Sequence, residues 1–288
     1  MFGRLTGPWV WALGFLSVGA LGVQAQEAQY VKTRVAFQAG SQVRSLQVIE
    51  VYLSGLSMRI TAECLKPPEA ECPDSLYLGD EKALYIIHHP RKLAMKVTKA
   101  DMDQLSRWIA PLLQAMPEGG SKGPSQSSGK PTSSDGGWTL RKVRPDVRIG
   151  SYKCDEYELR RRGELRGTVC IASYGSLGLD EAAFMAVVQD LARMTESLVQ
   201  AFRQELGEEM DEVPNPWTAI LQGKQPLYSG LPVRQVVRMA TGEESVSELL
   251  AAGRRKFTPA TFRVPADYKV VSVVEALGQL LPGSPPKP

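Results

Sequence analysis

The stretch SLYLGDEKALYIIHHPRKLAMKV, residues 75–97, decides the fold of this chain. Its apolar residues recur with a period of two, which is typical of strands that bury one face. Gly79-Asp80 and Pro90-Arg91 interrupt this alternation, as tight turns between antiparallel strands do. The stretch therefore predicts three consecutive antiparallel strands.

The same alternation continues on both sides of this stretch. Before residues 75–97 the alternation occurs in QYVKTRVAF, SLQVIEVYLSG and LSMRITAEC. After them it resumes in WTLRKV, VRIGSYKCDEYELRR, ELRGTVCIASYG, GLPVRQVVRMATG, ESVSELLAAGRRK and TFRVPADYKVVS. Two segments have helical periodicity instead: one begins at Thr98, where Asp101 completes a capping box, and a longer one begins at Asp180. We expect an α+β fold with one antiparallel sheet.

Residues 117–137, PEGGSKGPSQSSGKPTSSDGG, contain no large apolar side chain. Such a segment cannot offset the entropy of ordering, so we expect a disordered linker. Residues 26–116 would supply the first half of the sheet and a helix, and residues 138–281 the second half and the long helix, because neither half alone has enough strands to protect its edges. Residues 282–288 would form a frayed tail.

The first 25 residues, MFGRLTGPWVWALGFLSVGALGVQA, have the cationic start, apolar run and small-residue end of a signal peptide. We expect cleavage after Ala25 and a periplasmic or secreted protein with no transmembrane span after cleavage. Arg4 is the only charged residue of this leader, and the full chain has a formal net charge of +3. So small a charge argues against nucleic acid as a partner.

Four cysteines, Cys64, Cys72, Cys154 and Cys170, follow the leader, and in an oxidising compartment an even number suggests disulfides. Three pairings are open. Cys64 and Cys72 flank one Pro-rich loop, and Cys154 and Cys170 sit symmetrically about Arg162 in a predicted hairpin, so proximity favours these two pairs. A redox pair or a zinc site is the alternative, but the chain has no C-x-x-C motif and its two histidines are neighbours.

No catalytic motif emerges. SYGSLGLD has Tyr174 where a nucleophile elbow needs glycine, so we interpret it as a turn leading into the second helix. His88 and His89 have no partnered nucleophile and are expected to be solvated turn residues. The cluster of Arg160, Arg161, Arg162 and Arg166 is interpreted as a solvated hairpin tip. We predict no enzyme, no catalytic residue, no cofactor and no metal.

Several blocks of the sequence resemble a bacterial family of secreted domains of unknown function: IGSYKCDEYEL, GTVCIASYGSLGL, GLPVRQVVR and FRVPADYKVV. That family is in turn similar to the LolA/LppX-like lipoprotein-carrier superfamily. The resemblance implies a strongly curved antiparallel sheet, a half-open barrel, with helices packed on its concave face. The linker and the pair Cys64 and Cys72 depart from the family pattern.

The resemblance also implies a cavity between the sheet and the helices for a lipid or a lipoprotein acyl chain. The apolar helix faces would line it, and the candidate residues are Trp108, Leu112, Met116, Phe184, Val188, Leu191 and Met194. The function expected is therefore a non-enzymatic exported binding or carrier protein. The alternative is a structural or interaction module of the cell envelope, with a solid core and a protein partner.

Overall fold

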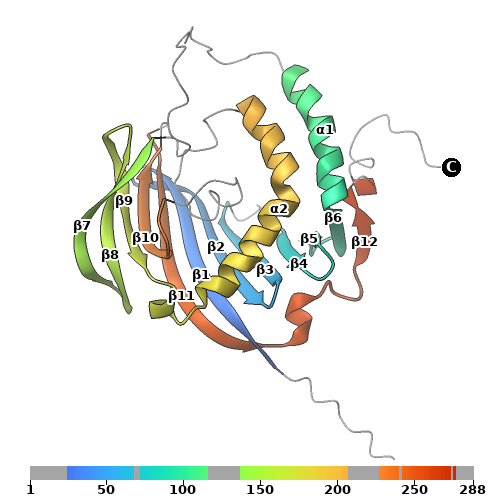
Figure 1. Cartoon of the computed structure of the whole chain (residues 1–288), viewed down its shortest axis with the longest axis horizontal. Helices are drawn as coiled ribbons and strands as arrows, with labels where there is room; N and C mark the ends of the chain where they lie inside the picture. Colours follow the sequence, from blue (N-terminus) through green and yellow to red (C-terminus); the bar gives the residue numbers. More distant parts are fainter. Residues whose placement is uncertain are drawn as a thin grey trace, which may run out of the picture.

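The computed structural model of the chain describes residues 25–67, 72–115, 137–206, 227–239, 242–273 and 275–276 (Figure 1). Within its helices the side chains of residues 108–115, 198–199 and 201–206 are not described. The predicted leader up to Gln24, the predicted linker up to Gly136 and the predicted tail lie outside these residues.

Twelve strands form one sheet among the described residues. The strands are β1 (Gln26–Ala39), β2 (Gln42–Ser54), β3 (Ser57–Lys66), β4 (Asp74–Leu78), β5 (Ala83–His88), β6 (Leu93–Thr98), β7 (Trp138–Ile149), β8 (Tyr152–Arg161), β9 (Glu164–Ala172), β10 (Leu231–Arg238), β11 (Glu244–Phe257) and β12 (Lys269–Ser272). Two α-helices, α1 (Lys99–Ala115) and α2 (Glu181–Leu206), and two 3₁₀ turns, Gly175–Leu177 and Pro259–Phe262, are the other elements of the described residues.

The strand order is β12-β6-β5-β4-β3-β2-β1-β11-β10-β9-β8-β7, so β1 and β11 join the two sequence halves at the middle of the sheet. The expectation of one shared sheet is therefore confirmed. The expectation that every strand is antiparallel is wrong for β12, which pairs in parallel with β6, Lys269 opposite Leu93. The C-terminal segment of the chain crosses to the far edge of the sheet to pair with β6. No local sequence pattern predicts such a long-range connection.

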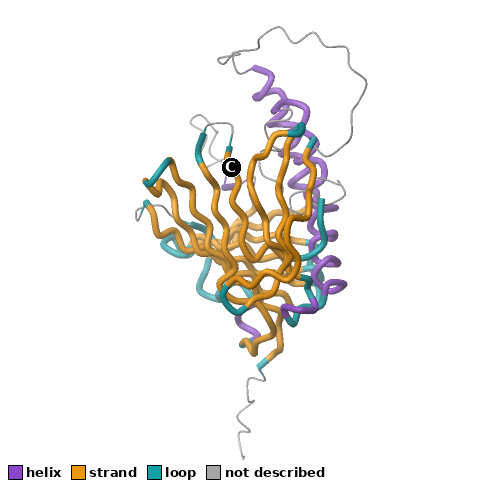
Figure 2. Tube along the Cα trace, turned by 90° about the vertical axis from the view of Figure 1, so that its left-hand side faces the viewer, coloured by secondary structure: helices purple, strands orange, loops and turns teal. Residues whose placement is uncertain are grey.

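The sheet is curved and does not close, and both helices lie along one of its faces (Figures 1 and 2). Period-two alternation assigns Val51, Met58 and Tyr77 to this face, where they pack with Phe184 and Val187 of α2. The opposite face of β4–β6 carries Leu76, Tyr85 and Ile87, against which Val264 and Tyr268 of the C-terminal segment pack. The fold class is α+β: an open, curved, mostly antiparallel sheet with two helices.

Both helices begin where the sequence predicts. The hydroxyl of Thr98 accepts a hydrogen bond from the amide of Asp101 at 3.3 Å, while the Asp101 carboxylate accepts one from the Thr98 amide at 2.8 Å. At α2, the carboxylate of Asp180 accepts a hydrogen bond from the amide of Ala183 at 3.1 Å. These bonds satisfy amides that an α-helix leaves unpaired in its first turn.

The hairpin of β8 and β9 turns at Arg162 and Gly163, whose φ values of 52° and 86° lie in the left-handed region. Two such residues in succession match the type I′ turn of two-residue hairpins. Arg161 lies opposite Glu164, so the centre of the hairpin falls between Arg162 and Gly163 and not at Arg162.

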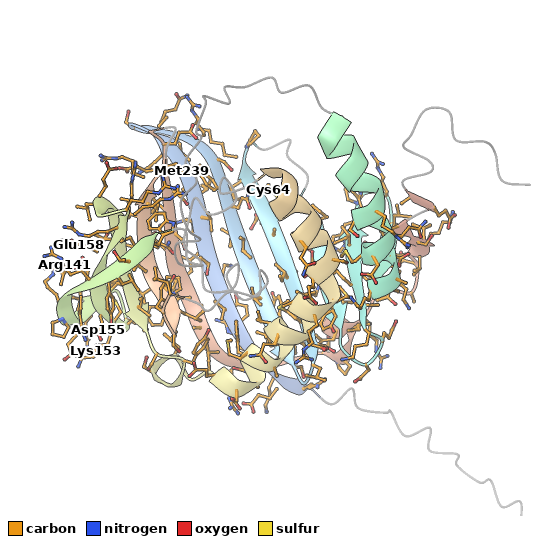
Figure 3. The ribbon with its side chains drawn as sticks, turned by 45° about the horizontal axis from the view of Figure 1, so that its top comes forward. Cys64, Arg141, Lys153, Asp155, Glu158 and Met239 are labelled. Carbon is orange, nitrogen blue, oxygen red and sulfur yellow. A yellow bond between two sulfur atoms is a disulfide. The ribbon has the colours of Figure 1, made fainter. Side chains whose placement is uncertain are left out.

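Charged pairs cover the edge of the sheet at β7 and β8. Arg141 binds Glu158 at 2.6 Å (Figure 3). Lys142 binds Asp155 at 2.6 Å. Arg160 of the predicted solvated cluster also binds Glu158, at 2.9 Å. Such pairs add little stability on an exposed surface, but they make a strand edge a poor template for further pairing.

Candidate ligand-binding face

The apolar stripe of α2 faces the sheet. Phe184, Val188 and Met194 are 0%, 2% and 4% exposed, and Leu191 packs against the same core as a partly buried residue. Trp108 and Leu112 lie in α1, where the side chains are not described, and Met116 lies outside the described residues. The structure thus brings the four predicted α2 residues together in the core between α2 and the sheet.

A second apolar cluster lies over β7–β10. Its buried members are Trp138, Leu159, Val169, Ile171, Tyr228 and Val237, and we call it the Tyr228 cluster. Val237 pairs with Ser245, which pairs in turn with Phe37 of β1. Paired residues share a face of the sheet, so the cluster lies on the same face as Val31 and the helices. The apolar lining of this face therefore spans both halves of the chain.

Tyr228 places a polar atom in this apolar cluster. The residue is 8% exposed, and its buried hydroxyl has no hydrogen-bond partner. Burial raises the pKa of this hydroxyl, which therefore stays neutral and able to donate a hydrogen bond. Buried polar groups are nearly always hydrogen-bonded, so a donor that no side chain or backbone group of the cluster pairs with is unusual. Sequence reasoning missed Tyr228, because it stands just before β10 at a position that no periodic pattern includes.

Asp190 fixes α2 to the sheet. The hydroxyl of Tyr77 donates a hydrogen bond to its carboxylate at 2.5 Å, and the ammonium of Lys82 donates one at 2.7 Å. Burial by itself raises the pKa of this carboxyl, but the hydrogen bonds from Lys82 and Tyr77 outweigh burial and hold the pKa below its usual range. The helical periodicity of the apolar residues of α2 predicted its apolar packing against the sheet but not this polar contact.

His89 is an exposed turn residue, as the sequence suggests, but its ring is also held by two side chains, while His88 ends β5 and is half-buried. The Nε2 of His89 lies 2.9 Å from a carboxylate oxygen of Asp74 and its Nδ1 lies 2.8 Å from the hydroxyl of Tyr268. Arg59 binds the same carboxylate at 2.6 Å and donates to the carbonyl oxygen of Thr261 at 3.1 Å. These contacts hold the segment before β12 against the face of β3–β5 that is opposite the helices. This role depends on residues that are distant in the sequence.

The structure joins Cys64 to Cys72 and Cys154 to Cys170, with Cα–Cα distances of 5.8 Å and 5.4 Å. The second pair is not directly opposite across the hairpin, because Cys170 lies opposite Glu156. The hairpin turns between Arg162 and Gly163, and a register shift between Leu159 and Arg160 then displaces the pairing of the two strands by one further residue. The two cysteines are therefore diagonal neighbours, which still share a face because their offset is even.

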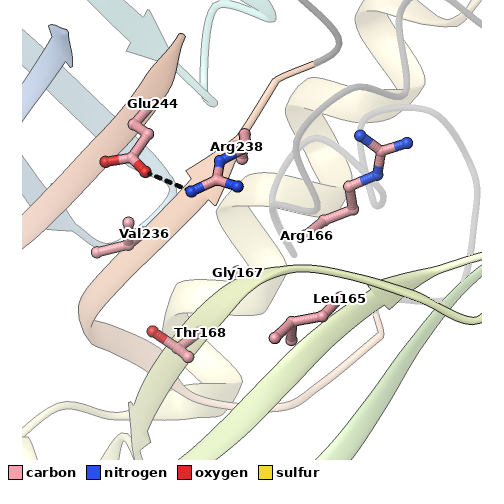
Figure 4. Close-up of a pocket in the computed structure, with 7 residues that line it drawn as sticks. All are labelled: Leu165, Arg166, Gly167, Thr168, Val236, Arg238 and Glu244. Atoms are coloured by element: carbon pink, nitrogen blue, oxygen red, sulfur yellow. Dashed lines mark hydrogen bonds and ion pairs between the residues drawn. The ribbon is translucent and has the colours of Figure 1, made fainter. Parts of the chain in front are cut away.

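Described residues line two of the pockets of this structure. One, of about 220 Å³, lies over β9 and β10 (Figure 4), and the other, of about 160 Å³, lies near Gln29 and Asp180. Neither includes a predicted cavity residue. Within the described part of the chain, no three His, Cys, Asp or Glu residues are grouped to hold a metal ion. No described helix is both long and apolar enough to cross a membrane.

The fold defines a class, an open curved α+β sheet whose helix side carries apolar clusters from both halves of the chain. No protein-family model matches the chain, and no curated protein matches it either. Among solved structures, a LolA superfamily protein from Nitrosomonas europaea is similar, with a TM-score of 0.30 and 11% sequence identity over 83% of this chain and 90% of that chain. The fold class stated above depends on the strand order and the helix positions, not on this likeness.

Proposed function

We propose that this protein is a non-enzymatic exported binding or carrier protein for an apolar ligand such as a lipid or a lipoprotein acyl chain. The observation that carries the proposal is the Tyr228 hydroxyl, which is buried in an apolar cluster without an acceptor. Lipids combine acyl chains with ester or amide carbonyl groups. A chain that packs on the Tyr228 cluster would bring such a carbonyl oxygen to this donor.

The apolar clusters supply the affinity that the proposal requires. Each methylene group removed from water contributes about 0.8 kcal/mol, so a few carbons of an acyl chain give measurable binding. Leu140, Tyr157 and Leu227, which pack on the Tyr228 cluster and are only partly buried, are the side chains such a chain would contact. The disulfides fit an exported protein, since disulfides persist in oxidising compartments.

Native mass spectrometry of protein purified from a periplasmic extract tests the proposal, together with displacement of a fluorescent fatty acid. We expect a co-purifying lipid and saturable displacement. Leu140→Asp, which places a charge at a partly buried position of the Tyr228 cluster, should weaken binding, whereas Leu165→Asp, at a position that is 57% exposed, should not. Absence of both lipid and displacement from the folded wild-type protein would refute the proposal.

A structural or interaction module of the envelope is the second candidate. Phe184 and Val187 are 0% exposed, as expected if the space between α2 and the sheet is solid core. The two described pockets, at about 220 and 160 Å³, are smaller than the roughly 300 Å³ typical of ligand sites. A protein that carries no lipid but captures an envelope protein through an exposed strand edge would favour this candidate.

A further inference from the structure

Strand β1 begins at Gln26, the residue that cleavage after Ala25 would leave at the start of the mature chain. Ala25, Gln26 and Glu27 are exposed, whereas the next residues of β1 are buried. In Figure 1 this start of β1, drawn in blue, lies at the lower end of the sheet. The first residue of the mature protein would therefore be an exposed end of a central strand.

The start of β1 has a free side. Gln26 lies opposite Phe257 of β11, but pairing with β2 starts only at Gln29, opposite Leu53. The side chain of Gln26 reaches towards β2, where its amide nitrogen donates a hydrogen bond to the hydroxyl of Ser54. A pocket of about 160 Å³, lined in part by Ser54, lies at the same end of the sheet. The surroundings of Gln26 thus leave room for a change in the shape of this residue.

Three cations of β11 lie beside the start of β1. Arg254, Arg255 and Lys256 are exposed, and they lie opposite residues 27–29 of β1. Glu27 is the carboxylate nearest in the sequence to this end, and it lies 3.9 Å from Arg254. Positive neighbours disfavour a further positive charge, so they favour the neutral form of an α-amine at Gln26. Only the neutral amine is nucleophilic.

We propose that Gln26 is converted to an N-terminal pyroglutamate in the mature protein and that the three cations of β11 favour this step. The neutral α-amine attacks the carbonyl carbon of its own side-chain amide. A carbon–nitrogen bond forms between these two atoms, and the bond from that carbon to the amide nitrogen breaks. The amide nitrogen takes up the proton that the amine loses and leaves as ammonia. The step needs no oxidant and no second substrate.

The product fits the contacts at this end of the sheet. The lactam is neutral, so it removes the α-ammonium group from beside the cations. Its carbonyl oxygen can accept a hydrogen bond from the hydroxyl of Ser54, because a serine hydroxyl donates as well as accepts. Aminopeptidases bind a free α-amine, which the lactam lacks. Since β1 pairs with both β2 and β11 at the middle of the sheet, a blocked end protects the strand that joins the two halves.

This inference rests on the exported part of the proposed function, because only cleavage of the leader exposes Gln26. It does not use the apolar ligand, so the two proposals can fail separately. A cyclised mature chain without any lipid would support the modification and refute the ligand. A lipid-bound mature chain that keeps the amine of Gln26 would do the reverse.

The intact mass of protein purified from a periplasmic extract tests the site. We expect the mass of residues 26–288 with both disulfides, less one ammonia, and fragmentation of the first peptide should place the loss on Gln26. Gln26→Asn is the matched control, because its shorter side chain would have to close a smaller, strained ring, and this variant should keep its amine. A wild-type chain that keeps its amine, or a mature chain that starts at another residue, would overturn the proposal.

The rate of cyclisation tests the role of the cations. It is followed by mass spectrometry after a specific protease exposes Gln26 in the folded chain. Lys256→Gln should slow the step about twofold, the effect of one screened charge at short range. Lys153→Gln, on β8 and 62% exposed on its side chain, should leave the rate unchanged. Melting temperatures verify that each variant is folded, and equal rates in wild type and Lys256→Gln would overturn the role of β11.

Discussion

The hydroxyl of Tyr77 on β4 donates a 2.5 Å hydrogen bond to the carboxylate of Asp190 on α2. The two residues are 113 positions apart in the sequence, one from each half of the chain. Tyr77 is 1% exposed and Asp190 is 9% exposed, so solvent screens this contact little. It fixes the position of α2 along the sheet, which the apolar stripe alone does not determine.

Asp190→Asn should lower the free energy of unfolding at pH 7 by about 1 to 3 kcal/mol, because hydrogen bonds to a charged group are lost or weakened. The pKa of Asp190 is lowered in the folded protein, so its contribution is present above the unfolded value near 4 and lost as the pH falls through the folded value. The difference between wild type and variant in urea unfolding should therefore shrink as the pH falls below about 4. Asp80→Asn, in an exposed turn, is the control, and a difference that stays constant as the pH is lowered would contradict the role of charge.

The double replacement Cys154→Ser with Cys170→Ser should lower the free energy of unfolding by about 3 kcal/mol, because the closed loop no longer restricts the unfolded chain. The pair Cys64 and Cys72 closes a shorter loop and should contribute about 2.5 kcal/mol. Denaturant unfolding measures both values. Mass mapping of non-reduced peptides should find these two pairs, and peptides that join Cys64 or Cys72 to Cys154 or Cys170 would show the pairing to be wrong.

Tyr228→Phe should raise the free energy of unfolding of the ligand-free protein by about 1 kcal/mol, because it removes a buried hydroxyl that has no partner. The same variant should bind an ester lipid more weakly, since the proposed donor to the carbonyl oxygen is lost. Thermal unfolding and fatty-acid displacement measure the two effects. A variant that is less stable than wild type would indicate that the hydroxyl has an acceptor in solution.

Gly167→Ala should destabilise the protein by about 1 to 3 kcal/mol, the usual range for forcing an atom into a packed site. A Cβ at this position would lie 1.9 Å from the carbonyl oxygen of Val236, so β9 or β10 must move. Gly175→Ala is the matched control, because a Cβ there meets no atom within 4 Å. The two melting temperatures should differ by several degrees, and equal values would mean that the β-bulge of β9, in which Arg166 is the extra residue, absorbs the added atom.

Much of the architecture was readable from local pattern. Alternation in residues 75–97 predicted β4, β5 and β6, and Thr98 with Asp101 predicted the start of α1, because strand and helix periodicity and helix capping depend on residues close in sequence. The α2 residues Phe184 and Val188 were predicted to face the sheet for the same reason, and they do.

Tertiary structure alone decided the rest, because it concerns contacts between residues that no sequence spacing relates. The parallel pairing of β12 with β6, the Tyr77–Asp190 hydrogen bond and the position of Tyr228 in an apolar cluster all depend on where distant segments meet. The bulge at Arg166 is a smaller case: one extra residue in β9 moves Cys170 opposite Glu156 and directs an arginine to a pocket. Periodicity determines which face a side chain occupies, whereas register and long-range packing determine what it meets there.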